Sequence, residues 1–273
     1  MRKIASFNVN GINARLPRLI EWLEKFQPDI LCLQELKSDD ARFPQEEIEK
    51  TGYYCLYHGQ KAYNGVAILS KEQPKLIRTS LPDDPDPTQS RYIEAEIDNL
   101  TVASLYLPNG NPLNSPKYDY KLAWFKAFLA HARSLWQQEK PVILAGDYNV
   151  VPSFDIKDIR NAAALADNAL LAPESLFYWR QLLAMGWTDS LRVRHPSEPL
   201  YSFWDYQAQS WPRDDGMRID HILLTPDLAD GLTDSGVDRQ MRGQEKASDH
   251  APVWIEIDDR GKYYNSNSHI AEA

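Results

Sequence analysis

Apolar residues recur along this chain in two rhythms, which predict a succession of strands and helices. Short apolar runs bounded by turn-forming residues predict buried strands, and apolar residues spaced three or four apart predict helices. The predicted strands span residues 3–9, 29–34, 53–59, 66–70, 75–79, 91–97, 100–107, 142–145 and 218–225, with a last strand within 247–257. The predicted helices span residues 45–51, 117–138 and 173–185, with a further helix between Asn13 and Pro28.

The strands predicted between residues 53 and 107 follow one another without a long helix, which predicts a meander. Two later segments have no single interpretation. Residues 155–172 are rich in Asp, Asn and Ala and match no element, while residues 201–206, YSFWDY, are dense in aromatic rings. The aromatic segment predicts either a core strand or a platform on which a base or sugar stacks, and core packing is the commoner role for any one ring.

The stretch PVILAGDYNVVP at residues 141–152 combines a buried strand with polar residues at its end. Its apolar run stops at Gly146, and Asp147 and Asn149 follow at alternating positions. If the chain stays extended there, both side chains point to the same side. A carboxylate and a carboxamide placed together suit a metal-bound water or a phosphoryl oxygen. Taken alone, however, the stretch is also ordinary turn material.

Other polar residues share this placement at or near the ends of apolar strands, and together they change the interpretation. Each one alone has an ordinary structural explanation, but independent surface residues would not be expected to share one location. If the strands stack in sheets, one rim gathers carboxylates, amides, a phenol and an imidazole. That set suits metal-assisted hydrolysis of a phosphodiester. The residues are Asn8, Glu35, Tyr106, Asp147, Asn149, Asp220, Asp249 and His250.

Composition narrows the class of protein. The 273 residues show no composition shift or repeat, so we expect one domain over residues 1–257, followed by a polar, flexible tail over 258–273. The first residues do not form a secretory signal and no stretch has membrane-spanning length, which predicts a soluble, cytoplasmic protein. Cys32 and Cys55 lie in strand-like apolar runs, which predicts reduced packing thiols.

The net charge of −9 argues against a nucleic-acid partner, because such proteins usually carry a basic surface. Local basic groups could still form a positive face, so the overall sign leaves the partner open. The absence of a GxSxG motif excludes a serine-nucleophile elbow, and the absence of a glycine-rich phosphate loop excludes a nucleotide kinase. The basic candidates are Lys37, Arg91, Lys117, Lys121, Arg213 and Arg218.

Six segments in order along the chain resemble the motifs of the exonuclease III family of abasic-site endonucleases. They are SFNVNG at 6–11, LQELK at 33–37, YLPNG at 106–110, GDYN at 146–149, RIDHIL at 218–223 and SDHAPV at 248–253. The wider endonuclease/exonuclease/phosphatase superfamily, which includes DNase I, shares the Glu, GDxN and SDH elements. The segments LQELK, YHGQK at 57–61 and SFWDY at 202–206 favour the DNA-repair branch.

The resemblance implies a fold, a reaction and a cofactor. The fold would be a four-layer, DNase I-like α/β sandwich, with two mixed β-sheets face to face and helices outside. The reaction would be Mg²⁺-dependent hydrolysis of duplex DNA, with Mn²⁺ as a possible substitute. It would combine incision 5′ to abasic sites with 3′-to-5′ exonuclease and 3′-phosphodiesterase activity. No membrane and no required protein partner are implied, and we expect a monomer.

The resemblance also implies roles for individual residues. Glu35 would hold the metal, with Asn8 nearby as an amide ligand or water-orienter. Asp147 would be the base or the orienter for the attacking water, and His250, held by Asp249, would contact a phosphoryl oxygen. Asp220 would lie near the leaving group or a second metal. The implied metal ligands are Asn8, Glu35, Asp147, Asn149, Asp249 and His250. The implied catalytic residues are Tyr106, Asp147, Asn149, Asp220 and His250, and the implied DNA-binding residues are Lys37, Arg91, Asn109, Phe203 and Trp204.

Two departures from the family pattern leave the balance of activities open. Asn109 stands where relatives often have glutamine, which shortens an expected DNA contact. The pair Phe203-Trp204, expected to line the pocket for a flipped-out abasic sugar, reads in reversed order in some members. A superfamily phosphatase or phosphodiesterase acting on inositol or lipid phosphates is the alternative. The branch-specific motifs disfavour it, and the presence of every motif residue disfavours a catalytically dead DNA-binding module.

Overall fold

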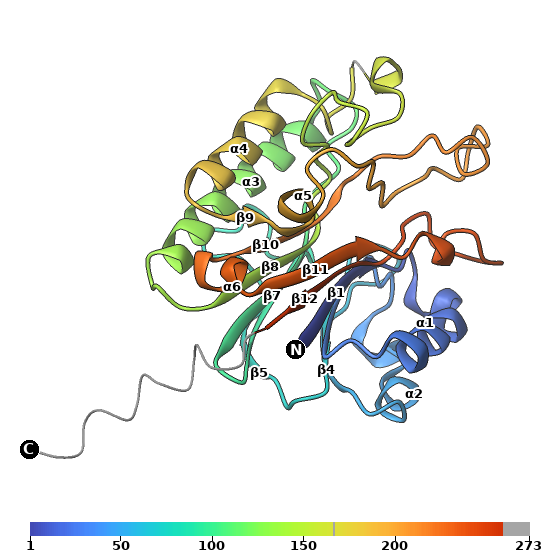
Figure 1. The fold of residues 1–273 in the computed structure, drawn as a ribbon, viewed down its shortest axis with the longest axis vertical. Helices are drawn as coiled ribbons and strands as arrows, with labels where there is room; N and C mark the ends of the chain where they lie inside the picture. The colour runs from blue at the N-terminus through green and yellow to red at the C-terminus, as the bar shows by residue number, and fades with distance from the viewer. Residues whose placement is uncertain (166, 259–273) are drawn as a thin grey trace, which may run out of the picture.

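A computed structural model describes residues 1–165 and 167–258 of the chain, and within them two β-sheets pack face to face with helices on both outer sides (Figure 1). Each sheet has six strands and mixes parallel with antiparallel pairs. In Figure 1, α3 and α4 cover one outer face, while α1 and α2 cover the opposite one. This arrangement confirms the four-layer α/β sandwich expected from the motifs.

The first sheet has the strand order β11-β12-β1-β2-β4-β3, and the second has the order β5-β6-β7-β8-β10-β9. The first comprises β11 (Leu232–Val237), β12 (Val253–Ile257), β1 (Arg2–Asn8), β2 (Ile30–Gln34), β4 (Val66–Ser70) and β3 (Tyr54–His58). The second comprises β5 (Lys75–Arg78), β6 (Tyr92–Ile97), β7 (Leu100–Tyr106), β8 (Val142–Asp147), β10 (Asp220–Leu224) and β9 (Thr188–Asp189).

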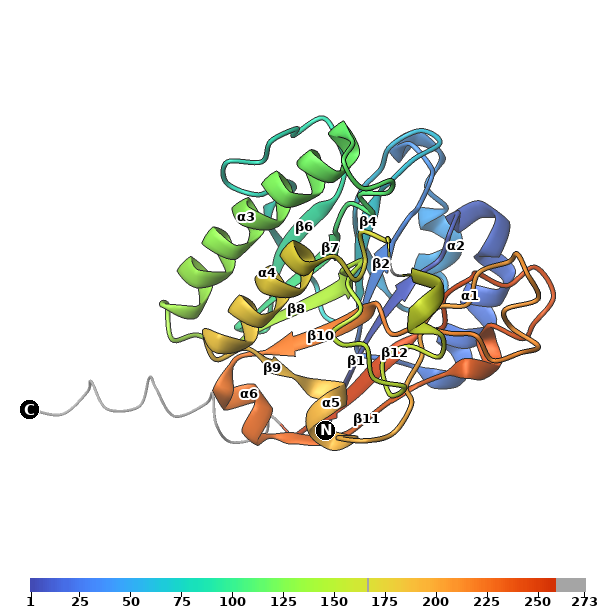
Figure 2. The same cartoon turned by 90° about the horizontal axis from the view of Figure 1, so that it is seen from above.

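The longest described helix is α3, with 21 residues, and it runs along the second sheet (Figure 2). Ser115 caps α3 by accepting a hydrogen bond from the backbone N–H of Tyr118, and Pro116 occupies its first turn, where no intrahelical N–H is needed. The helices are α1 (Ile12–Phe26), α2 (Gln45–Glu49), α3 (Pro116–Trp136), α4 (Pro173–Ala184), α5 (Ser190–Arg194) and α6 (Pro226–Asp230). Short 3₁₀ turns span Asp40–Arg42, Ala162–Leu165 and Arg239–Met241.

Alternation along each strand decides which side chains reach the layer between the sheets. Ile4 of β1 and Ile143 of β8 face inward and share one apolar cluster, whereas Ala5 and Leu144 face outward against the helices. Because strand residues two apart share a face, Asp147 must face inward with Ile143. The same rule sends Asn8 inward on β1. The sandwich therefore directs these two polar side chains toward each other.

The predicted meander is wrong as a single sheet. Strands β3 and β4 belong to the first sheet, whereas β5, β6 and β7 belong to the second, so the chain crosses between sheets after Ser70. Hydrophobic pattern cannot reveal this crossing, since strands of either sheet alternate in the same way. The sequence prediction also missed β9, β11, α5 and α6, which are short or broken by polar residues.

Three other segments complete the comparison with the sequence. Residues 201–206 form no strand, but Phe203 makes isolated bridges with Met217 and His250. The unassigned segment 155–172 consists mainly of turns around one 3₁₀ turn, with Ala166 outside the described residues. The predicted flexible tail lies outside them too, apart from its first residue. Among the residues described, no helix is both long and apolar enough to cross a membrane.

Candidate active site

The predicted polar residues meet at one end of the sandwich because several strands end or begin there. In the second sheet, Tyr106 and Asp220 stand in register on either side of Asp147. In the first sheet, Asn8 ends β1 and Glu35 follows β2, its parallel neighbour. Carboxyl ends of parallel strands lie at the same edge of a sheet. The facing edges of the two sheets thus bring these side chains together.

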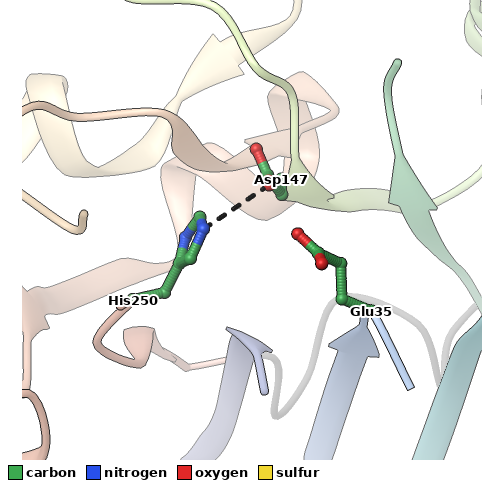
Figure 3. Close-up of side chains that lie close together, drawn as sticks. All are labelled: Glu35, Asp147 and His250. Atoms are coloured by element: carbon green, nitrogen blue, oxygen red, sulfur yellow. Dashed lines mark ion pairs between the residues drawn. The ribbon is translucent and has the colours of Figure 1, made fainter. Parts of the chain in front are cut away.

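Glu35, Asp147 and His250 converge at the centre of this edge (Figure 3). One potential ligand atom of each lies within 4.8 Å of the others. Asn8 joins the two acids, since its Nδ2 donates to Glu35 Oε1 at 2.9 Å and to Asp147 Oδ2 at 3.0 Å. Asn8 Oδ1 in turn accepts a hydrogen bond from the backbone N–H of Asn10. In this orientation Asn8 holds the carboxylates and offers them N–H groups.

Glu35 stays ionised because cationic and amide groups surround it. It follows β2 in a left-handed conformation, with φ of 51°, which turns its side chain toward the second sheet. Lys37 Nζ lies 2.8 Å from Glu35 Oε2. Burial raises the pKa of Glu35, but the charge of Lys37 and the hydrogen bond from Asn8 outweigh burial, so the pKa falls below its usual value.

Asp147 has the properties of a base near neutral pH. Its Oδ1 accepts the backbone N–H of Asn149 at 2.9 Å, and this turn places Asn149 in a left-handed conformation. Burial raises the pKa of Asp147 to about 7, against the opposing effect of the His250 charge, and nearby Asp220 and Glu35 raise it further. Its carboxylate is therefore ready to exchange a proton close to physiological pH.

His250 is held by Asp220, and the prediction that Asp249 orients it is wrong. Asp220 Oδ2 lies 2.8 Å from His250 Nδ1, while His250 Nε2 lies 3.7 Å from Asp147 Oδ2. Through this contact Asp220 supports the imidazole. Burial alone would lower the pKa of His250, but the adjacent Asp220 carboxylate overrides burial and raises it to about 10. The imidazole is thus a hydrogen-bond donor at neutral pH, which argues against its expected role as a metal ligand.

Asp249 faces another group. Its Oδ1 accepts a hydrogen bond from Asn10 Nδ2 at 2.9 Å, and the side chain is half-buried at the rim. Asn10 also accepts a hydrogen bond from Lys37 Nζ, so Asp249, Asn10 and Lys37 form a chain that leads to Glu35. Asp249 is adjacent to His250 in sequence, but its carboxylate points along this rim.

Tyr106 places a neutral hydroxyl beside the acids. Burial raises the pKa of Tyr106 well above its usual value, and the negative charges of Glu35 and Asp147 add to this effect. The guanidinium of Arg91 stacks on the Tyr106 ring at 4.9 Å and donates to its backbone carbonyl. The phenol therefore remains protonated and can donate a hydrogen bond to an anion. Arg91 holds the Tyr106 ring through these two contacts, and part of the Arg91 side chain is exposed to solvent.

The aromatic pair divides into one residue at the site and one in the core. The Phe203 ring lies 4.9 Å from the His250 ring in an edge-to-face contact. Trp204 is fully buried and its Nε1 donates to Asp214 Oδ1, so the prediction that Trp204 lines the substrate pocket is wrong. Consecutive residues in extended backbone point to opposite sides, which explains the division. Only Phe203 can contact a bound ligand.

Asn109, which the sequence predicted to bind DNA, lies next to Asn149 and is hydrogen-bonded to it. Its Nδ2 donates to Asn149 Oδ1 at 3.0 Å, and its Oδ1 accepts from Asn111 Nδ2 at 2.8 Å. The other end of the Asn149 carboxamide is fixed too, since Asn149 Nδ2 donates to the carbonyl of Leu107 at 2.8 Å. Asn149 is thus held at both ends by the segment that carries Tyr106.

The donor set fits a hard divalent cation. Carboxylate oxygens are the ligands that Mg²⁺ prefers, and Glu35 and Asp147 supply them from opposite sheets. His250 completes the cluster with a nitrogen, but its proton makes it a partner for an anion. Asp249 belongs to the rim and lies outside the cluster of three potential ligands. These acidic residues could hold a metal ion.

Sequence reasoning missed two residues that complete the site. Ser202 Oγ donates to Asp220 Oδ2 at 2.6 Å and accepts the backbone N–H of Ile219 and Asp220. Ser248 Oγ donates to the carbonyl of Asn8 at 2.7 Å and so ties the segment before β12 to β1. Both serines are the first residues of segments singled out in the sequence, SFWDY and SDHAPV, in which the aromatic or charged side chains drew attention. Their place in those segments was their only sequence signal.

Comparison with known proteins places this site in a family. The sequence profile of the endonuclease/exonuclease/phosphatase family matches residues 5–250. Exodeoxyribonuclease III of Haemophilus influenzae is 35% identical over 265 residues, which cover 93% of this chain and 99% of that protein. This chain belongs to the endonuclease/exonuclease/phosphatase family. The resemblance seen in its motifs is confirmed.

Solved structures place it in the DNA-repair branch of that family. The 3′ phosphatase NExo from Neisseria, solved with a product DNA hairpin, is 38% identical with a TM-score of 0.91, and the match covers 94% of this chain and 100% of that one. An AP endonuclease from Archaeoglobus fulgidus is 35% identical with a TM-score of 0.89, at 94% and 100% coverage. This family member is a hydrolytic DNA-repair nuclease.

Proposed function

We propose that the protein hydrolyses phosphodiester bonds in duplex DNA with Mg²⁺, cutting 5′ to abasic sites and removing nucleotides or blocking groups from 3′ ends. The observation that carries this proposal is the cluster of Glu35, Asp147 and His250, joined by Asn8 across the two sheets. It combines metal ligands, a base with a pKa of about 7 and an anion donor in one place. The 3′ phosphatase and the AP endonuclease among its structural relatives support the same class of bond.

Glu35 and Asp147 would hold the cation, with Mn²⁺ as a substitute for Mg²⁺. When bound, a divalent cation polarises a phosphoryl oxygen and offsets its negative charge. Lys37, on the outer side of Glu35, keeps that carboxylate ionised and so keeps its oxygens available as ligands. The carboxamide of Asn8 fixes the separation of the two acids before any ligand arrives.

Asp147 acts on the attacking water. Its carboxylate takes the proton as the water oxygen bonds to phosphorus and the P–O bond to the leaving oxygen breaks. The backbone N–H of Asn149 holds Asp147 Oδ1, which leaves Oδ2 as the oxygen that faces His250 and Asn8. Before a cation binds, burial raises the pKa of Asp147 to about 7, so its carboxylate holds a proton more readily than an exposed aspartate does.

Three neutral or cationic donors stabilise the charge that develops on the phosphoryl oxygens. His250 Nε2–H is directed by the Asp220 contact on its other nitrogen. The hydroxyl of Tyr106 is kept protonated, and the carboxamide of Asn149 is held at both ends. Donors that are fixed before the reaction need no reorganisation in the transition state, which is the main source of such stabilisation.

The proposal also covers the residues that contact DNA, the domain organisation, the cellular compartment and the oligomeric state. Phe203, beside His250, would pack against the sugar at the cleaved bond, and Lys37 with Arg91 would attract the DNA backbone. Residues 1–257 would form one domain, because strands from both halves of the chain share the apolar layer between the sheets. The unpaired thiols Cys32 and Cys55 fit a reducing cytoplasm, and we propose that the protein acts there as a monomer.

Cleavage of labelled duplex oligonucleotides tests the proposal. The substrates carry a central abasic site, a 3′-phosphate or an ordinary 3′ end, and each is incubated with Mg²⁺, with Mn²⁺ or with EDTA. We expect metal-dependent cleavage on the 5′ side of the abasic site and release from 3′ ends, with EDTA abolishing both.

The control is Asp147→Asn, which keeps the shape of the side chain and removes the base. Cleavage that persists in this variant would contradict the proposed role of Asp147. If folded wild-type protein left all DNA substrates intact but released phosphate from inositol or lipid phosphates, the phosphatase alternative would replace the DNA reaction. Activity on 3′-phosphates without abasic-site incision would restrict the reaction to 3′ ends.

A further inference from the structure

Lys121 on α3 is a fully buried cation that lies beside the site without facing it. Its Nζ donates to the backbone carbonyls of Asn149 at 2.7 Å, Asn109 at 3.1 Å and Ala169 at 3.2 Å. An ammonium group has three N–H donors, so these carbonyls use all of them. Burial lowers the pKa of Lys121 to about 7, and the nearby Asp147 charge opposes this effect.

The three acceptors come from three separate segments of the chain. Asn109 belongs to the YLPNG segment after β7, Asn149 belongs to the GDYN turn after β8, and Ala169 belongs to the turns before α4. The helix that carries Lys121 is the longest of the described helices and packs on the second sheet. The ammonium therefore connects three loops to one rigid element at the floor of the site.

Gly110 shows how closely the loop is fitted to this lysine. Its φ is +85°, a conformation that favours glycine. A Cβ added there would lie 2.5 Å from Lys121 Cδ, which is closer than such atoms approach, and 3.1 Å from Lys121 Cβ, which is a tight contact. The YLPNG segment thus crosses directly over the lysine stem, and its glycine allows that crossing.

The same loops control the orientation of the Asn149 carboxamide. Its Oδ1 accepts from Asn109 Nδ2, and its Nδ2 donates to the carbonyl of Leu107. A hydrogen-bonded row continues from Asn109 to Asn111, and Asn111 Nδ2 donates to Asn168 Oδ1 at 3.0 Å. Displacing any of these loops would move the carboxamide, because both of its ends are bonded to loop atoms.

We infer that Lys121 is a positioning residue, which holds the Asn149 carboxamide in the site by fixing the carbonyls of Asn109, Asn149 and Ala169. A cation that served only to fill the core would be an expensive choice, because burying a charge is costly unless it is fully hydrogen-bonded. An apolar side chain of similar length would fill that volume without fixing the loops. The inference rests on the proposed nuclease function for its kinetic readout, and its structural readout is independent of activity.

Lys121→Met removes the three donors and keeps the length of the stem. We expect single-turnover cleavage at saturating duplex DNA to fall by about 10- to 100-fold, because a small displacement of a catalytic group has effects of that size. The dissociation constant for DNA, measured by fluorescence anisotropy with EDTA present, should not change. Lys126→Met, an exposed position on the same helix, is the matched control and should cleave like the wild type.

A double-mutant cycle with Asn149→Ala separates a positioning role from general damage to the site. If Lys121 acts through Asn149, Lys121→Met should reduce cleavage much less in the Asn149→Ala background than in the wild type. Equal fold reductions in both backgrounds would overturn the inference, as would an unchanged rate for Lys121→Met. Failure of wild type and Lys126→Met to cleave would instead refute the proposed function.

Side-chain amide signals in ¹H–¹⁵N spectra of the protein without DNA test the positioning directly. The Asn149 amide signal should move or broaden in Lys121→Met and stay in place in Lys126→Met. If Lys121→Met does not fold, Lys121→Arg replaces it, since a planar guanidinium keeps the charge but cannot reproduce the three-carbonyl geometry. An Asn149 signal and a cleavage rate identical to wild type in Lys121→Arg would then overturn the inference.

Discussion

Two Asp-His dipeptides, Asp220-His221 and Asp249-His250, look alike in the sequence, but their histidines face opposite sides of the sheets and have different partners in the structure. His250 faces the layer between the sheets and takes Asp220 as its partner. His221 faces outward, where its Nε2 lies 3.0 Å from the carbonyl of Val150 and its ring packs on Trp179. Neither histidine pairs with the aspartate that precedes it. Successive residues of an extended chain point to opposite faces, so the side chain of each histidine points away from the aspartate before it. The carboxylate that contacts His250 therefore comes from another strand, β10.

The surroundings of the two histidines give them opposite charge states. His221 lies against Arg218, which forms ion pairs with Asp158 and Asp189 inside the protein. Burial and then the charge of Arg218 lower the pKa of His221 to about 4. The carboxylate of Asp220 instead raises the pKa of His250 to about 10. At neutral pH one imidazole is therefore neutral and structural, while the other is charged and can bind an anion.

The two regions also differ in how completely the oxygens of their acids are used. Both carboxylate oxygens of Asp158 and of Asp189 accept hydrogen bonds, most of them from Arg192 and Arg218. In the described part of the chain, Asp220 Oδ1 is a buried atom without a hydrogen-bond partner. Buried polar atoms are normally paired, so an unpaired one at a cluster of acids indicates a site prepared for a further group.

The largest expected effect separates the two histidines by activity. His250→Gln should lower kcat for abasic-site cleavage by about 10²- to 10⁴-fold, the usual range for loss of a group that exchanges or donates a proton. His221→Gln should change kcat far less, since its side chain points away from the site. Gel-based cleavage assays on both variants, with circular dichroism to check folding, measure this difference. Similar losses in the two variants would contradict it.

The next effect separates the two aspartates. Asp220→Asn should lower kcat by about 100-fold, because the amide no longer supports the charged imidazole of His250. Asp249→Asn should cost about 10-fold at most, since it disturbs only the rim contact with Asn10. Steady-state kinetics under the same conditions compare the two. A larger loss for Asp249→Asn would restore Asp249 as the partner of His250.

The smallest effect on cleavage is expected for His221→Gln. This variant should instead change how the free energy of unfolding depends on pH. The unfolded histidine takes up a proton near pH 6.5, but the folded one does so only near pH 4, so acidification through this window favours the unfolded chain. Between pH 7.5 and 4, the wild-type free energy of unfolding should fall by about 3 kcal/mol more than that of His221→Gln. Urea unfolding at a series of pH values measures it, and parallel curves would refute it.

Strong local patterns made much of the fold predictable. The apolar runs located β1, β2, β4 and β8 to within two residues at each end, and the spacing of apolar residues located α1, α3 and α4. Weak patterns failed. The strand β11 contains Thr, Asp, Ser and Gly, so it carries no apolar run that could announce it. The predicted meander holds for β5, β6 and β7 but does not extend to β3 and β4, since alternation does not say which sheet a strand joins.

The site residues also divide into those that the sequence could identify and those that it could not. Asn8, Glu35, Tyr106, Asp147 and His250 could be chosen from sequence because each stands at or near a strand end, and the structure brings them together. Their exact partners could not be chosen. Trp204 was assigned to the pocket with Phe203 because the family resemblance implies a pocket lined by this aromatic pair, and it proved to be buried. Lys121 drew notice only as a basic residue, since nothing local marks a lysine that contacts three distant carbonyls.

By itself, the sequence determined which polar residues stand at or near strand ends, most of the strands and helices that hold them, and the family to which the chain belongs. These properties depend on residue type and on spacing over a few positions, which a chain contains before it folds. Tertiary structure alone decided that Asp220, and not Asp249, contacts the imidazole of His250, and that the acids of two sheets share one bridging amide. Those facts depend on contacts between residues 27 to 139 positions apart, where only the packing of the sheets sets the distance.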